Sequence, residues 1–170
     1  MPAFTAPPAP YAGPEFVAPA IMTVAGVLSD YPASAPYRGK YVRVSDLFGY
    51  VDGVMRCGFD GTQYFWQPTS TDYGRDLPVV ADMTITPHGH PTSFNLTGSI
   101  LVGITRQITL SPTNGWPGAI KEFKNGLSSL LGGLNIVGLG LGSTVSIPLG
   151  GYKKFYLDSS GGTLAWRQLV

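Results

Sequence analysis

Residues 51–66 read Val-Asp-Gly-Val-Met-Arg-Cys-Gly-Phe-Asp-Gly-Thr-Gln-Tyr-Phe-Trp, and this stretch decides the fold class. Two runs suited to β-strands, 51–59 and 62–66, flank the turn Phe59-Asp60-Gly61. An Asp-Gly between two such runs indicates a hairpin, because glycine accepts the positive φ of a tight turn. The alternation of polar and apolar residues over 40–44 adds a further strand. Residues 40–68 are therefore predicted to form a small antiparallel unit.

The C-terminal part of the chain repeats this pattern of short apolar runs separated by turn signals. The predicted strands cover residues 79–86, 98–110, 119–124, 134–137, 144–147, 152–157 and 163–169. Residues 120–131 also fit helical spacing, but Asn125-Gly126 and Gly132-Gly133 favour a strand, a turn and a loop. Several short strands at regular spacing predict an antiparallel β-sandwich, jelly-roll-like, over residues 77–170.

The composition points to the same class. Charged residues make up 12% of the 170 residues and apolar residues 44%, with 23 glycines and 15 prolines. This mixture is rich in turn formers and poor in the residues that build solvent-facing helices. The length allows one main domain of roughly 100 to 150 residues with an appendage. We therefore expect an all-β protein with one principal domain.

The charge balance of the chain bears on which classes of partner it can bind. A net charge of +1, with basic and acidic residues scattered, offers no stripe that would neutralise phosphates, so nucleic acid is not expected. So few charges on an apolar chain indicate that part of the surface faces protein rather than water. The single cysteine, Cys57, lies in a predicted strand and is expected to be buried and inert. The apolar stretch 16–28 has no preceding basic residue and contains Pro19, so it predicts neither a signal peptide nor a membrane span.

Residues 1–37 differ from the rest. They hold eight of the fifteen prolines and only two charged residues, Glu15 and Asp30. Because proline fixes φ and lacks an N–H, we expect an extended arm rather than a helix or a central strand. Apolar side chains along it predict docking on a neighbouring subunit, and a flexible linker is the alternative. The predicted docking residues are Phe4, Tyr11, Phe16, Val17, Ile21, Met22, Val24 and Leu28. The predicted organisation is thus an arm (1–37), a hairpin module (38–76) and a sandwich (77–170).

The sequence offers few groups for chemistry. His88 and His90 would point to the same side of an extended segment, as a metal site needs, but the flanking Pro87 and Pro91 favour a plain exposed turn. No serine has the setting of a catalytic nucleophile, and most Asp residues lie in turns, where their side chains bond the backbone. Spacing alone cannot establish a pair of glycosidase carboxylates. We therefore expect no catalytic residues, no cofactor and no resident metal.

The three tryptophans, Trp66, Trp116 and Trp166, together with neighbouring tyrosines and phenylalanines, would suit a sugar-binding face or a subunit contact, since aromatic rings stack on sugars and anchor interfaces. The alternative is that most of them fill the core.

Several segments together resemble proteins of tailed-phage particles. They are Arg106-Gln107-Ile108-Thr109-Leu110, Gly118 to Phe123, Gly150 to Asp158 and Leu164-Ala165-Trp166-Arg167, preceded by Val42 to Leu47 and by Tyr64-Phe65-Trp66-Gln67-Pro68. This order is similar to the hairpin modules and C-terminal β-sandwiches of phage fibre, spike and head-decoration proteins. The likeness covers residues 40–68 and 79–170.

The resemblance implies a non-enzymatic protein of the virion surface, made in the host cytoplasm. A homotrimer is implied, with the N-terminal arm fixing it to the major capsid protein or another virion protein. A short chain with an apolar arm favours a capsid decoration, cement or head-fibre subunit. The alternatives are a tail-fibre or spike module that binds host glycan, and a small enzyme.

Overall fold

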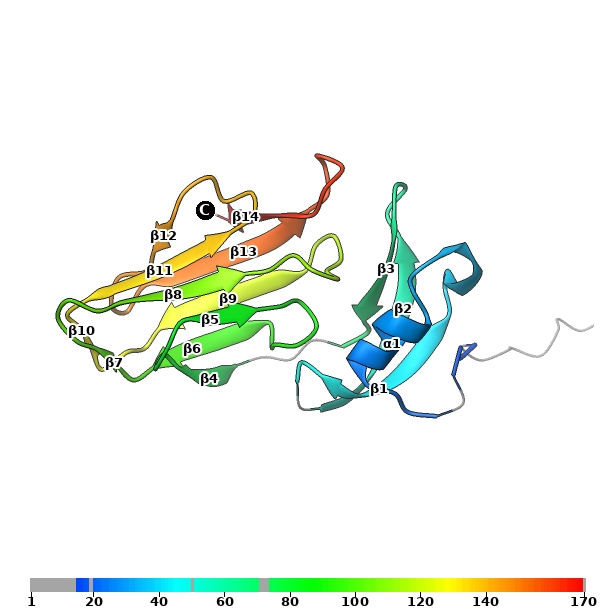
Figure 1. Cartoon of the computed structure of the whole chain (residues 1–170), viewed down its shortest axis with the longest axis horizontal. Coiled ribbons are helices and arrows are strands. Elements are labelled where there is room, and N and C mark those ends of the chain that lie inside the picture. The colour runs from blue at the N-terminus through cyan, green and yellow to red at the C-terminus, as the bar shows by residue number, and fades with distance from the viewer. Residues whose placement is uncertain (1–14, 19, 50, 71–73, 170) are drawn as a thin grey trace, which may run out of the picture.

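The chain folds around two separate hydrophobic clusters. The computed structural model describes residues 15–18, 20–49, 51–70 and 74–169. One cluster gathers residues between Ala18 and Trp66, and the other gathers residues between Val79 and Trp166. We call residues 15–68 the N-terminal unit and residues 75–169 the C-terminal unit. Apart from one short α-helix and one short 3-10 helix, the regular structure of the described residues is all strand, so the all-β class is confirmed (Figure 1).

The N-terminal unit is a small antiparallel sheet covered by a helix. Its elements are α1 (Val24–Asp30), η1 (Ala35–Tyr37), β1 (Tyr41–Leu47), β2 (Val51–Phe59) and β3 (Tyr64–Pro68). The strands lie in the order β1-β2-β3, and Cys57 pairs with Trp66 across the hairpin. The predicted hairpin at Asp60-Gly61 is therefore confirmed. Cys57 is buried, as expected, and burial raises the pKa of its thiol.

Helix α1 corrects one part of the predicted extended arm, residues 24–30, whereas residues 1–14 of that arm lie outside the described residues. Between Pro19 and Pro32 the chain has no proline, and Thr23 caps the helix by accepting a 3.0 Å hydrogen bond from Gly26 N. Val24 and Val27 lie three residues apart and are buried against the sheet. The prolines therefore bound a local helix instead of preventing it.

The C-terminal unit consists of two facing sheets and a short corner ladder. Its strands are β4 (Arg75–Pro78), β5 (Met83–Ile85), β6 (Ser93–Thr97), β7 (Ser99–Ile100), β8 (Thr105–Leu110), β9 (Ile120–Asn125), β10 (Ser129–Leu130), β11 (Gly133–Gly138), β12 (Val145–Ser146), β13 (Tyr152–Asp158) and β14 (Ala165–Leu169). One sheet has the order β14-β13-β9-β6-β4, and the other has the order β12-β11-β8-β5. The strand β7 pairs with β10 where the chain crosses from one sheet to the other.

The two sheets are not the antiparallel jelly roll that the sequence predicted. The chain alternates between them, so that β4, β6 and β9 are parallel neighbours in one sheet and β5, β8 and β11 are parallel neighbours in the other. Each pair of passes adds one coil to a short stack. Antiparallel pairing is confined to the last strands, where β12 joins β11 and β13 joins β9 and β14. The sequence pattern missed this because one-sided burial gives the same alternation in both kinds of sheet.

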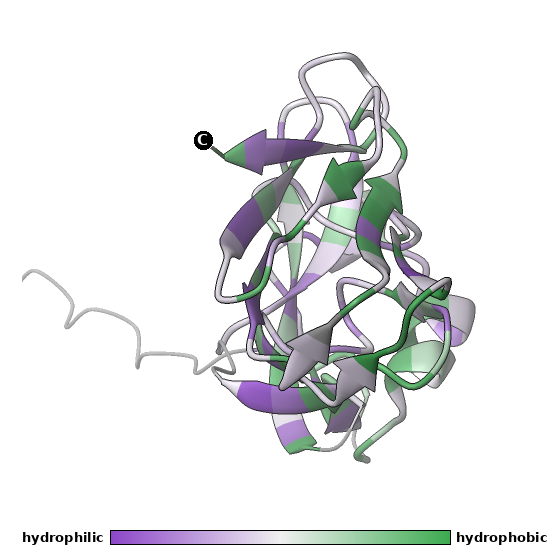
Figure 2. Cartoon of the chain, turned by 90° about the vertical axis from the view of Figure 1, so that its left-hand side faces the viewer, coloured by the Kyte–Doolittle hydropathy of each residue, from purple (hydrophilic) through white to green (hydrophobic). Residues whose placement is uncertain are grey.

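The coil gives the C-terminal unit two different ends. The connections 86–92, 111–119, 139–144 and 159–164 lie at the end that faces the N-terminal unit, which we call the junction end. The connections 79–82, 101–104, 131–132 and 147–151 lie at the opposite, distal end. Figure 2 looks onto the distal end, where several connecting segments are coloured as hydrophobic. The stacking of parallel coils thus collects loops from distant parts of the sequence at each end.

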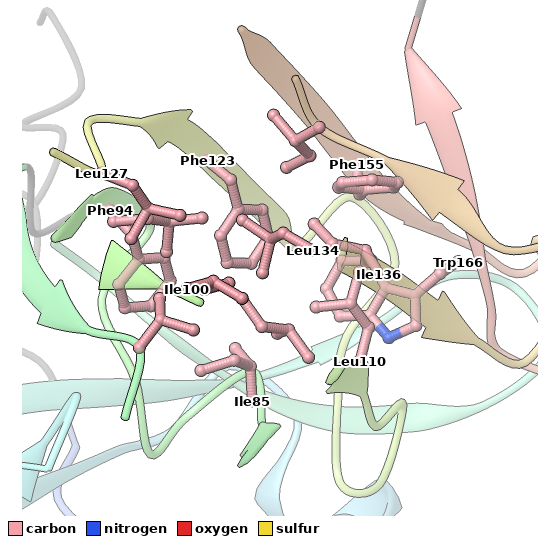
Figure 3. Packing of buried hydrophobic residues seen from close by; sticks show 14 of the residues in the cluster. Ile85, Phe94, Ile100, Leu110, Phe123, Leu127, Leu134, Ile136, Phe155 and Trp166 are labelled. Carbon is pink, nitrogen blue, oxygen red and sulfur yellow. The ribbon is translucent and has the colours of Figure 1, made fainter. Parts of the chain in front are cut away.

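The larger core fills the space between the two sheets (Figure 3). The rings of Phe94 and Phe123, on neighbouring parallel strands, stack with centroids 5.2 Å apart. Phe155 meets Phe123 edge-on at 6.0 Å. Trp166 on the last strand is fully buried in the same cluster. A row of aromatic rings therefore joins successive coils, which is the geometry in which aromatic pairs add stability beyond area burial.

Candidate functional site: the junction groove and the distal end

The two units meet at the connection between β5 and β6, residues 86–92. His88 O accepts a 2.7 Å hydrogen bond from Phe48 N, and His88 Nε2 lies 2.8 Å from Trp66 O. Because a carbonyl only accepts, Nε2 carries the proton in this contact. The Trp116 ring packs on the His88 ring with centroids 4.9 Å apart. His88 therefore lies between the units, hydrogen-bonded to the N-terminal unit and packed against Trp116 of the C-terminal unit.

A close backbone approach completes this contact. Gly49, after β1, has φ +86°, and a Cβ added there would lie 2.8 Å from Gly89 O. Only glycine tolerates both the positive φ and this spacing. The junction thus depends on glycine at position 49.

Lys121 holds the junction connection from inside the C-terminal unit. The burial alternation of β9 turns its side chain inward. Its ammonium donates to the carbonyls of Pro87 at 3.1 Å and Pro91 at 2.8 Å, and also to the carbonyl of His90. Burial lowers the pKa of Lys121 to about 7, while the three carbonyls favour the charged form and oppose that shift. A buried cation bonded only to carbonyls is a structural clamp on the loop.

The two histidines do not form the plain exposed turn that the sequence predicted. His88 is buried, and burial lowers the pKa of its imidazole to about 4. His90 is half-buried and accepts a 3.1 Å hydrogen bond from Thr86 N at Nδ1. The two rings bond to different partners rather than converging on one point. Among the described residues, no group of three or more His, Cys, Asp or Glu side chains is placed to hold a metal ion.

A groove runs along the junction between the two units. Its first part, with a volume of about 390 Å³, is lined on one side by Val24, Ala25 and Leu28 of α1 and on the other by Thr86 and neighbouring residues. The second part, of about 230 Å³, shares Leu28 and Asn114 with the first and continues past Tyr64. The groove therefore has an apolar helix wall and an aromatic extension.

The predicted docking residues lie in several environments. Phe4 and Tyr11 are outside the described residues. Phe16 and Met22 are half-buried and bridge to β1, which places this segment on the chain's own sheet. Val17 and Leu28 are half-buried, Val24 is buried in the core, and Ile21 is exposed. Most of the described members therefore pack within the N-terminal unit.

The three tryptophans also lie in different environments. Trp66 and Trp166 are buried in the two cores, so neither presents a ring for sugar or for another subunit. Trp66 Nε1 donates a 2.7 Å hydrogen bond to Tyr31 O. Trp116 is half-buried at the junction against His88. The alternative prediction, that most of the tryptophans fill the core, therefore holds for Trp66 and Trp166.

Two carboxylates, those of Asp60 and Asp158, bond turn residues, as the sequence predicts for most Asp residues of this chain. Asp60 Oδ1 accepts hydrogen bonds from Thr62 N at 2.8 Å and Gln63 N at 2.9 Å, and the bond from Gln63 leads in lowering its pKa. Asp158 accepts from the Ser160 hydroxyl at 2.6 Å, which lowers its pKa in the same direction. Both are held as ionised turn residues rather than as proton donors.

The distal end carries the exposed apolar surface that sequence reasoning missed. Large side chains more than half exposed project from all four of its connections; they are Val80, Leu101, Val102, Leu131 and Leu149. Only the coil topology brings these five residues to one end, so no local sequence signal marks them. Exposed apolar side chains gathered at one end of a fold are typical of a surface that contacts protein or membrane.

Comparison with family models, curated proteins and solved structures finds no match for this chain. No helix among the described residues has the length and apolar character needed to cross a bilayer.

Proposed function

We propose that this chain is a non-enzymatic structural subunit that works by docking on other protein. The observation that carries the proposal is the distal end, where four connections of the coil each present large apolar side chains to solvent. Val102, the most exposed of them, is 75% accessible. Covering a large aliphatic side chain contributes roughly 1.5 to 3 kcal/mol. Covering five such side chains would therefore offset part of the free-energy cost of association.

The resemblance to tailed-phage proteins gives this docking role a setting. In that setting the chain is a homotrimeric capsid decoration, cement or head-fibre subunit on the virion surface, assembled in the host cytoplasm. Its partners are further copies of itself and the major capsid protein or another virion protein. The low charge of the sequence supports a subunit whose surface is partly covered in the particle.

Sedimentation equilibrium of the full chain, alone and with purified tailed-phage capsids, tests the proposal. The matched variants are Val102→Asp at the distal end and Leu139→Asp, which is 58% exposed at the junction end. We expect the wild-type chain and Leu139→Asp to form trimers or to sediment with capsids. Val102→Asp should do neither, because it places a charge in the covered surface.

Two results would contradict this role. One is a wild-type chain that stays monomeric and leaves capsids untouched. The other is a Val102→Asp chain that assembles as well as Leu139→Asp. Binding of the monomer to a glycan array would instead favour a receptor-binding module.

A further inference from the structure

The junction groove has the chemistry of a site for an extended apolar segment. Its two parts have Leu28 and Asn114 in common, and their other lining residues extend from Gly49, after β1, to Tyr64 and Phe65 of β3. Of the described residues that line it, Asp46 alone carries a charge, and its Oδ1 already accepts a 2.6 Å hydrogen bond from Val24 N. Tyr64 and Phe65 line the far part. Aromatic-lined grooves of this kind take proline-rich segments, which lose little entropy on binding.

The same chain contains a segment of matching chemistry. Residues 1–14 read Met-Pro-Ala-Phe-Thr-Ala-Pro-Pro-Ala-Pro-Tyr-Ala-Gly-Pro, with five prolines, two aromatic residues and no charge. Such a sequence favours the polyproline II conformation and offers apolar rings to a groove. At about 3.1 Å per residue it would extend over roughly 40 Å, which is long enough to reach a neighbouring molecule.

The point at which the chain enters the fold favours a second molecule as the receiver of the segment. Phe16 bridges to Tyr41 and Met22 bridges to Val44, both in parallel, so the chain enters the fold beside the start of β1 and runs toward its end. Glu15 is held at that start by a 2.8 Å ion pair with Lys40. The 390 Å³ part of the groove lies at the other end of β1, beside Asp46, whereas the 230 Å³ part lies beside Tyr64 and Phe65 of β3. Glu15, the first described residue, therefore lies at the end of β1 opposite to the 390 Å³ part of its own groove.

We propose that residues 1–14 of one copy occupy the junction groove of a second copy. This inference deepens the proposed function, and rests on it, by naming the partner of a second docking surface. In the assembly each copy donates one segment and receives one.

Disulfide trapping between full-length chains tests the exchange. One chain carries Ala9→Cys in the segment, and a second carries Ala25→Cys, at an exposed position on the groove wall. The native Cys57 is buried and does not compete. We expect a disulfide between the two chains on mild oxidation. Val80→Cys, exposed at the distal end, is the matched control and should give little product with Ala9→Cys.

A blocking variant checks that the groove itself is the receptor. Ala25→Arg fills the groove with a long cationic side chain without touching the core. With the cysteine moved to Asn114→Cys, we expect Ala25→Arg to lower the yield about tenfold or more, the change that corresponds to the loss of one good contact. Circular dichroism verifies that the fold is retained.

Three outcomes would overturn the exchange: no disulfide between Ala9→Cys and Ala25→Cys, equal yield with Val80→Cys, or an intramolecular disulfide in a dilute chain that carries both changes. The first two would exclude the groove as a receptor, and the third would show that each segment returns to its own groove. Adding Val102→Asp separates this inference from the proposed function. A Val102→Asp chain that still forms the disulfide shows segment exchange without distal docking.

Discussion

Acid should destabilise this protein through His88. Its Nε2–H donates to Trp66 O, and its Nδ1 is buried with no hydrogen-bond partner. Protonation would place a second N–H where nothing accepts it, so burial holds the pKa at about 4, below the ordinary 6.5. As the pH falls, the unfolded chain binds this proton before the folded chain does. The stabilisation is therefore complete above pH 6.5 and is lost as the pH falls toward 4.

The size of this effect follows from the two pKa values. Moving the pKa from 6.5 to about 4 corresponds to roughly 3 kcal/mol, at about 1.4 kcal/mol per pH unit. A domain is stable by only about 5 to 15 kcal/mol, so the loss should be easy to measure. Urea unfolding followed by tryptophan fluorescence at closely spaced pH values between about 7 and about 4 gives the free energy of unfolding directly.

The variant His88→Gln isolates the titrating group. Its side-chain amide can still donate to Trp66 O but does not bind a proton in this range. We expect the wild type to lose roughly 3 kcal/mol more than His88→Gln as the pH falls. His90→Gln is the matched control, because burial lowers the pKa of His90 in the same direction, but its ring is only half-buried and does not contact the N-terminal unit through a hydrogen bond to Trp66. If wild type and His88→Gln lose stability in parallel, the buried imidazole is not the acid-sensitive group.

Three further substitutions test the clamp, the junction and the core, each by urea unfolding. The free energy of unfolding of the wild type, relative to that of Lys121→Met, should rise between pH 7 and pH 10.5. The folded chain releases the Lys121 proton near pH 7, whereas the unfolded chain keeps it until about pH 10.5. A difference that stays constant with pH would refute the low pKa. Gly49→Ala should cost about 3 kcal/mol, from a positive φ and the contact with Gly89 O, whereas Gly61→Ala, which meets no atom within 4 Å, should cost about 1 kcal/mol. Equal costs would show that the close approach at the junction is unimportant. Phe123→Ala should cost about 3 to 5 kcal/mol, because it opens a cavity between two neighbouring rings, and a smaller loss would mean that the sheets close over it.

Local signals predicted the parts of this fold that depend on adjacent residues. The Asp60-Gly61 hairpin forms as expected because turn chemistry and strand propensity act within a few residues. Strand β6 was missed, although Ser93 to Thr97 alternate in burial, because the run is short and follows a proline. Helix α1 was missed because prolines on both sides outweighed a short proline-free stretch. Both errors arise where the helix or strand preference of a short run is close in strength to the breaking effect of the neighbouring prolines.

Other features depend on which strands become neighbours, and no local pattern contains that information. Parallel pairing of β8 with β11 joins residues more than twenty positions apart. The clamp has the same character, because Lys121 bonds carbonyls 30 to 34 residues earlier in the chain. In sequence, Lys121 looked like an ordinary strand lysine, and the two histidines looked like an exposed turn. Only the coil shows that all of them build the junction.

The proposed role in assembly rests on the difference between the two ends of the coil. At the junction end, Lys121 donates hydrogen bonds to the connection 86–92 and the N-terminal unit covers His88, whereas all four distal connections keep large apolar side chains exposed. A groove that receives a segment from one neighbour, while its own segment goes to another, makes a heterologous contact. Such contacts close only as a ring. A homotrimer built by segment exchange would therefore fill every groove, whereas a dimer formed through the distal end alone would fill none.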